Sequence, residues 1–170
     1  MDLEKFIVNV PNYPMEGIQF KDITPLLGNK DAFNEAINRL AEFGKKMGAN
    51  VVMGPDARGF IFGAAVAYSM NSGFVPVRKP NKLPRKSINE SYSLEYGSNT
   101  LCIHEDALKE GDKVLIVDDL LATGGTVVAA INLVKRLKAE VVGVAVLIEL
   151  EDLKGRELIG DYPLLSLIKY

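Results

Sequence analysis

The chain has 170 residues, 48% of them hydrophobic and 25% charged, as expected for one ordinary globular domain over residues 1–170. Its formal net charge of -2 argues against the dominant basic face of a nucleic-acid-binding protein. A single cysteine, Cys102, excludes an internal disulfide and a cysteine-rich zinc site, and it suits a reducing environment.

Neither a targeting segment nor a membrane span is expected from the sequence. The first five residues lack the basic start and the apolar run of a signal peptide. The apolar runs are interrupted by charge or glycine before they reach about 18 residues. We therefore expect a cytoplasmic protein with no membrane partner.

The first half of the chain alternates between helical and strand patterns. Asp31 is expected to cap a helix over residues 31–47, which carries one apolar face. A buried strand follows over residues 51–53, then an apolar helix over residues 59–71 and a further strand over residues 74–77.

Residues 78–90 are polar and basic, contain prolines, and are predicted to form a loop. Residues 91–96 and 100–104 then predict a hairpin around Gly97. No separate domain or repeat is indicated in this part of the chain.

Two later runs, residues 114–117 and 141–148, are apolar on both faces, which is typical of central strands in a parallel sheet. A helix is predicted between them over residues 125–138. Strands that alternate with helices predict an α/β fold with a parallel sheet and right-handed crossovers. Ligands of such sheets bind beyond the carboxyl ends of the strands, so functional residues are expected directly after each strand.

The clearest motif, VLIVDDLLATGGT, occupies residues 114–126 and joins an apolar strand to a helix. The amides at the start of that helix favour an anion, most naturally a phosphate. Glycines permit close approach of the backbone, and threonine hydroxyls add donors. The predicted anion site consists of Ala122, Thr123, Gly124, Gly125 and Thr126.

The acid pair Asp118 and Asp119 should lie beside that anion site. Carboxylates there can accept hydrogen bonds from ribose hydroxyls or hold a hydrated magnesium ion. A phosphate site beside such acids describes a pocket for a 5-phosphoribosyl group. The competing interpretation is an ordinary strand–helix corner in which Asp119 or Thr123 caps the helix.

Other nucleotide motifs are missing. Residues 54–59 have the two-glycine spacing of a P-loop, but Phe60 and Ile61 follow where lysine and a hydroxyl residue are needed. No GxGxxG sequence occurs. ATP hydrolysis and dinucleotide redox chemistry are both disfavoured.

At the acid pair and the glycine turn, the sequence resembles the type I phosphoribosyltransferases. VDDLLATGGT alone marks the donor-binding superfamily, whereas ARGFIFG (residues 57–63) and YSLEYG (residues 92–97) point to the members that act on adenine. Residues 13–22 and 78–84 match as well, so the similarity covers nearly the whole chain in order.

The resemblance implies transfer of the 5-phosphoribosyl group from 5-phosphoribosyl 1-diphosphate (PRPP) to adenine, which forms AMP and pyrophosphate. It also implies a parallel sheet of about five strands with flanking helices, a small hood, a flexible loop, a magnesium-dependent reaction and a homodimer. Two alternatives stay open: an enzyme for another purine such as xanthine, or a non-catalytic regulator that senses PRPP.

A basic segment is expected to close over the pyrophosphate of the donor and exclude water. Its five cations are Arg78, Lys79, Lys82, Arg85 and Lys86. From charge alone, a solvated loop or an RNA-binding patch is the favoured interpretation of these residues.

The remaining site residues are assigned by the resemblance. Phe20 and Leu150 match positions that sandwich the base, and the backbones of Gln19 and Lys21 match positions that contact its edge. Without the resemblance, Phe20 and Leu150 are interpreted as core residues.

The resemblance also assigns three residues near the reaction. Arg58 matches a position near the base and the pyrophosphate, after an Asp56–Ala57 peptide expected to be cis; otherwise it makes a simple salt bridge at the helix start. Glu95 is expected to favour the developing positive charge of the ribosyl ring or to deprotonate the purine, with Tyr96 hydrogen-bonding nearby. The alternative for Glu95 is a strand edge that faces solvent.

Overall fold

A computed structural model describes residues 1–93 and 97–170. The predictions for Glu95 and Tyr96 therefore lie outside the described residues. Within the described ranges, no helix is both long enough and apolar enough to cross a lipid bilayer.

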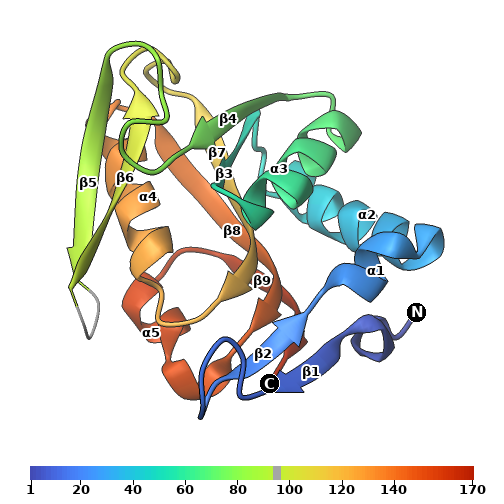
Figure 1. Ribbon diagram of the computed structural model, residues 1–170. Helices are drawn as coiled ribbons and strands as arrows, with labels where there is room; N and C mark the ends of the chain where they lie inside the picture. The colour runs from blue at the N-terminus through green and yellow to red at the C-terminus, as the bar shows by residue number, and fades with distance from the viewer. Residues whose placement is uncertain (94–96) are drawn as a thin grey trace.

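The centre of the protein is a five-stranded parallel sheet in the order β4-β3-β7-β8-β9 (Figure 1). This sheet confirms the predicted α/β architecture. Its strands are β3 (Val51–Pro55), β4 (Gly73–Val77), β7 (Lys113–Leu121), β8 (Glu140–Glu149) and β9 (Leu164–Lys169).

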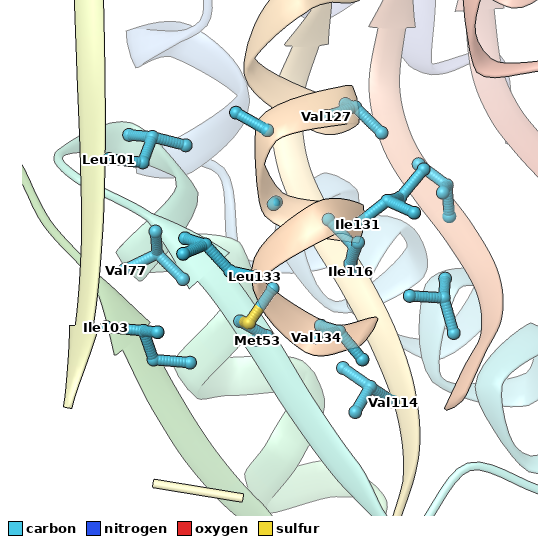
Figure 2. Packing of buried hydrophobic residues seen from close by; sticks show 14 of the residues in the cluster. Met53, Val77, Leu101, Ile103, Val114, Ile116, Val127, Ile131, Leu133 and Val134 are labelled. Atoms are coloured by element: carbon cyan, nitrogen blue, oxygen red, sulfur yellow. The ribbon is translucent and has the colours of Figure 1, made fainter. Parts of the chain in front are cut away.

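Helices cover both faces of the sheet because successive residues of the central strands point to opposite sides. In β7, Val114 and Ile116 pack with α4 (Gly125–Arg136) and with the hairpin of β5 (Ser87–Ser93) and β6 (Ser98–His104). Figure 2 shows these two side chains among those of α4. Leu115 and Val117 belong to the core under α2 (Lys30–Lys46) and α3 (Arg58–Ser69). Residues 114–117 are therefore apolar on both faces because both faces of β7 are buried, as the sequence predicted.

Smaller elements surround this framework (Figure 1). An antiparallel ribbon at the N-terminal side pairs β1 (Val8–Pro11) with β2 (Gln19–Asp22), and a longer hairpin pairs β5 (Ser87–Ser93) with β6 (Ser98–His104). The remaining elements are the short helices η1 (Leu3–Phe6), α1 (Thr24–Gly28), η2 (Glu151–Leu153) and α5 (Gly155–Ile159).

Several boundaries differ from the sequence prediction, and three of these differences have a clear physical reason. Asn29, not Asp31, caps α2, because its side-chain oxygen accepts hydrogen bonds from the amides of Asp31 and Ala32. Strand β7 continues past the acid pair to Leu121, where it still pairs with β8. Strand β5 begins at Ser87 and shortens the predicted loop, because the polar residues at its start pair with β6.

An ion pair between a buried carboxylate and a largely exposed arginine fastens the end of β8 to α5. Glu149 is only 3% exposed, and Arg156 Nε and Nη2 donate to its two carboxylate oxygens at 2.9 and 2.7 Å. Ser166 in β9 donates to the same carboxylate at 2.5 Å. The Arg156 hydrogen bonds hold the pKa of Glu149 below its ordinary value of 4.5.

This pair predicts a specific pH dependence of stability. Because the folded-state pKa is lowered, the carboxylate stabilises the fold fully above about pH 4.5 and loses that effect as the pH falls through the folded-state pKa. Glu149→Gln should cost about 1–2 kcal/mol of unfolding free energy near neutral pH. Urea unfolding should show this difference shrinking in acid; a difference that does not change with pH would contradict the assignment.

Candidate active site

The carboxyl ends of β3 and β7 open into one cavity of about 440 Å³. Two chain segments supply most of its wall: the loop from β3 into α3 and the turn from β7 into α4. The first segment contains the Asp56–Ala57 peptide, which is cis as the resemblance implied. Lys79 and residues of the β5–β6 hairpin complete the lining.

The predicted anion site forms the floor of this cavity. Its five residues, Ala122, Thr123, Gly124, Gly125 and Thr126, all line the cavity. Gly124 precedes α4 with φ +92°, a left-handed conformation that favours glycine. The start of α4 therefore presents backbone amides to the cavity, the arrangement that binds phosphate.

Space around the turn is limited on two sides. A Cβ atom added to Gly124 would lie 2.9 Å from the carbonyl oxygen of Gly155. One added to Gly125 would lie 2.7 Å from the ring of Tyr92. The Tyr92 hydroxyl also shares a 2.9 Å hydrogen bond with the hydroxyl of Thr126.

The acid pair lies beside the turn and is linked to Arg58. Asp119 is buried, and its Oδ2 lies 2.6 Å from Nε of Arg58. The amide of Asp119 donates to Oδ1 of Asp118 at 2.8 Å. Burial, followed by the charge of Asp119, raises the pKa of Asp118 well above its ordinary value. The salt bridge anticipated as an alternative for Arg58 exists, and it lies inside the site.

The residues present fit a magnesium ion that arrives with a substrate. Magnesium prefers oxygen ligands and keeps several waters, often with only one or two protein carboxylates plus substrate phosphates. Asp118 and Asp119 supply such carboxylates at the cavity wall. In the described part of the chain, no cluster of three or more His, Cys, Asp or Glu residues forms a complete metal cage.

The five cations of the basic segment have different surroundings, and they do not all face the cavity. Lys79 lines the cavity, and Arg78 Nε donates to Asp56 Oδ2 at 3.2 Å. The carbonyl oxygen of Lys82 accepts a hydrogen bond from Arg78 Nη1, so Lys82 lies beside Arg78. Among the described residues, Lys82 does not line the cavity.

The last two cations of the segment pair with acids beyond the hairpin. Arg85 contacts Asp106 at 2.6 Å, and Lys86 contacts Glu105 at 3.5 Å. Only part of the predicted basic cluster therefore faces the site in this conformation.

A second, smaller cavity of about 120 Å³ adjoins the first, and Arg58 and Asp119 line both. All four residues assigned to the base meet here: Gln19, Phe20, Lys21 and Leu150. The Arg58 guanidinium lies 5.5 Å from the centre of the Phe20 ring. Phe20 and Leu150 are both half-buried, and Leu150 also packs against the core that contains α2.

Sequence reasoning missed three residues around the site. Tyr92 was placed in a hairpin without a role, although it contacts the glycine turn. Asp56 was not considered as the partner of Arg78. Gly155, which supports the turn from behind, was overlooked because nothing in the local sequence indicates its contact with Ala122 and Gly124, which lie far earlier in the chain.

Comparisons with known proteins agree with this arrangement. The family model of the phosphoribosyl transferase domain matches residues 27–169. The chain thus contains the domain of a phosphoribosyltransferase.

More specific relatives are adenine phosphoribosyltransferases. The one from Solidesulfovibrio magneticus is 56% identical over 169 residues, 99% of each chain, and one from a Thermotoga species is 55% identical over both whole chains. The solved structure of the Thermoanaerobacter pseudethanolicus enzyme has a TM-score of 0.96 and 47% identity, and the match covers 99% of this chain and 98% of that one. The chain belongs to the adenine phosphoribosyltransferase family.

Proposed function

We propose that this enzyme transfers the 5-phosphoribosyl group of PRPP to adenine, releasing pyrophosphate and forming AMP in purine salvage. One observation carries the proposal: an anion turn and a slot lined by Phe20 and Leu150 open on either side of Arg58 and Asp119. The spacing of a nucleoside monophosphate product, with phosphate at one end and base at the other, suits two adjoining cavities of this kind.

Ligands in related structures support the proposal. The Saccharomyces cerevisiae adenine phosphoribosyltransferase, 37% identical with a TM-score of 0.90, was solved with adenine and an imino-altritol bisphosphate. The Trypanosoma brucei enzyme, 25% identical with a TM-score of 0.88, was solved with AMP, pyrophosphate and ribose-5-phosphate.

On the donor side, the turn formed by residues 122–126 binds the 5-phosphate through its amides and hydroxyls. Asp118 and Asp119 accept hydrogen bonds from the ribose hydroxyls. Magnesium, held by the donor and by these carboxylates, would neutralise the charge of the departing pyrophosphate. Lys79 and Arg78 add positive charge at the same end, and Lys82 joins them when the loop closes.

On the base side, Phe20 and Leu150 hold the flat ring between them. The side chains of Gln19 and Lys21 are both occupied by Asn9, through hydrogen bonds of 2.8 and 3.0 Å. Their contribution to the edge of the base therefore falls to the backbone. Arg58 orients the base and the pyrophosphate from between the two cavities, with its guanidinium fixed by Asp119.

The bond to the ribosyl carbon breaks with growing positive charge on the sugar ring, so negative groups nearby lower the barrier. By resemblance, Glu95 supplies that charge or removes the purine proton, and Tyr96 hydrogen-bonds nearby. Most of the remaining rate enhancement comes from holding donor and base in contact and excluding water. A homodimer and a cytoplasmic location complete the proposal.

Pyrophosphate release tests the function directly. The purified chain is mixed with PRPP, magnesium and one purine at a time: adenine, xanthine, hypoxanthine or guanine. Release with adenine alone is expected. Release with xanthine instead would indicate a phosphoribosyltransferase for another purine. Tight PRPP binding without turnover would indicate a non-catalytic regulator that senses PRPP.

Tyr92→Phe is predicted to raise the KM for PRPP about fivefold with little change in the KM for adenine. The hydroxyl that orients Thr126 is lost, whereas the ring that packs on Gly125 stays. A single hydrogen bond of about 1 kcal/mol accounts for this factor. Steady-state kinetics with Tyr68→Phe, an exposed control, give the comparison; equal KM values for PRPP would refute the role.

A further inference from the structure

A cluster of Glu149, Arg156 and Ser166 lies outside the lining of both cavities, yet it holds a buried charged carboxylate with every oxygen hydrogen-bonded. Among the described residues, Glu149 and Asp119 are the two charged residues classed as buried, and Asp119 belongs to the active site. Arg156 and Ser166 together satisfy both carboxylate oxygens of Glu149. The Arg156 side chain is 44% exposed, so it reaches in from the surface to hold a carboxylate that is itself buried.

On one side, the cluster reaches the base slot. Glu149 stands between Ile148 and Leu150, and both of these neighbours line the smaller cavity. The amide of Leu150 donates to the carbonyl of Leu121 at 2.9 Å, at the end of β7. Fixing the Glu149 side chain therefore fixes the backbone that carries one wall of the slot.

On the other side, the cluster reaches the anion turn. Arg156 follows Gly155, whose Cα and carbonyl lie against Gly124; a Cβ added to Gly124 would meet them at 3.2 and 2.9 Å. Gly155 itself allows no side chain, because a Cβ there would collide with the carbonyl oxygen of Ala122. The start of α5 is thus packed against the back of the turn that holds the phosphate.

We propose that the Arg156–Glu149 pair is a positioning device that keeps the base slot and the phosphate turn in register, so that both ends of one nucleotide are held at the correct spacing. Arg156 touches neither substrate; it acts through Leu150 on one side and through Gly155 on the other. The inference rests on the proposed function, because it assigns the slot to the base and the turn to the phosphate.

Two ligands separate this role from a merely structural one. Ribose 5-phosphate engages the turn alone, whereas AMP engages the turn and the slot. The variant Glu149→Gln/Arg156→Met removes both partners and leaves no unpaired buried charge. Arg156→Lys keeps the charge but loses the paired geometry of the guanidinium. Ile37→Val, on the buried face of α2 and outside the lining of both cavities, serves as a destabilised control.

Calorimetric titration well below each melting temperature should show the double variant binding ribose 5-phosphate about threefold more weakly and AMP about tenfold more weakly. Arg156→Lys should fall between the double variant and the wild type, and Ile37→Val should bind both ligands normally. The proposal is overturned if AMP is weakened no more than ribose 5-phosphate, or if only the melting temperature changes. Adenine-dependent pyrophosphate release by the wild type tests the function separately, so the two failures are distinguishable.

Discussion

Replacing both acids of the pair, Asp118→Asn/Asp119→Asn, is expected to lower kcat/KM for PRPP by at least about a hundredfold. The change removes the acceptors proposed for the ribose hydroxyls and the carboxylates that help hold magnesium. It also releases Arg58, whose Nε lies 2.6 Å from Asp119. Three contributions to the same substrate are lost together, so this is the largest effect predicted at the donor side.

Stability should change much less than activity in this variant. Burial and the charge of Asp119 already disfavour the ionised form of Asp118, since they raise its pKa. Asparagine keeps the shape and relieves the repulsion between two neighbouring carboxylates. Steady-state kinetics and thermal unfolding, measured beside Asp31→Asn/Glu42→Gln on the exposed side of α2, provide the test. Normal PRPP kinetics in the acid-pair variant would remove Asp118 and Asp119 from the site.

Sequence patterns were sufficient for the central framework because its strands are buried on both faces. Residues 114–117 and 141–148 are apolar without alternation, which is the pattern that central parallel strands require. Strand β9 was not identified, because it lies at the edge of the sheet and most of its residues are only half-buried. The cap of α2 was misplaced by two residues, because Asn29 and Asp31 are both good capping residues and only the backbone geometry selects between them.

The anion turn was predictable for a similar reason: phosphate binding is a property of the backbone, and adjacent glycines before a helix reveal it in sequence. Contacts that join distant segments were not predictable. The links from Tyr92 to Thr126 and from Arg78 to Asp56 depend on how the hairpin and the loop cross the sheet edge. The base slot was located only by resemblance, because neither Phe20 nor Leu150 differs in sequence from an ordinary core residue.

The turn itself gives the second large prediction: Gly124→Ala should raise the KM for PRPP and lower kcat/KM about a hundredfold. Alanine at φ +92° is strained, and its Cβ would lie 2.9 Å from the carbonyl oxygen of Gly155. That neighbour is backbone and cannot rotate away, so the turn has to move. Amides displaced by even about 1 Å no longer meet the phosphate at hydrogen-bonding distance.

The control variant Gly48→Ala separates the effect of backbone strain from the effect of a displaced phosphate-binding turn. Gly48 also has a positive φ, +76°, but has open space around its Cβ position and lies after α2. Gly48→Ala should lose about 1–2 kcal/mol of unfolding free energy because alanine is forced into a left-handed conformation. Gly124→Ala should lose more, because its Cβ also meets the carbonyl oxygen of Gly155. Only Gly124→Ala should lose affinity for ribose 5-phosphate. Equal ribose 5-phosphate binding by the two variants would mean that the phosphate does not rest on this turn, and the assignment of the larger cavity to the donor would fail with it.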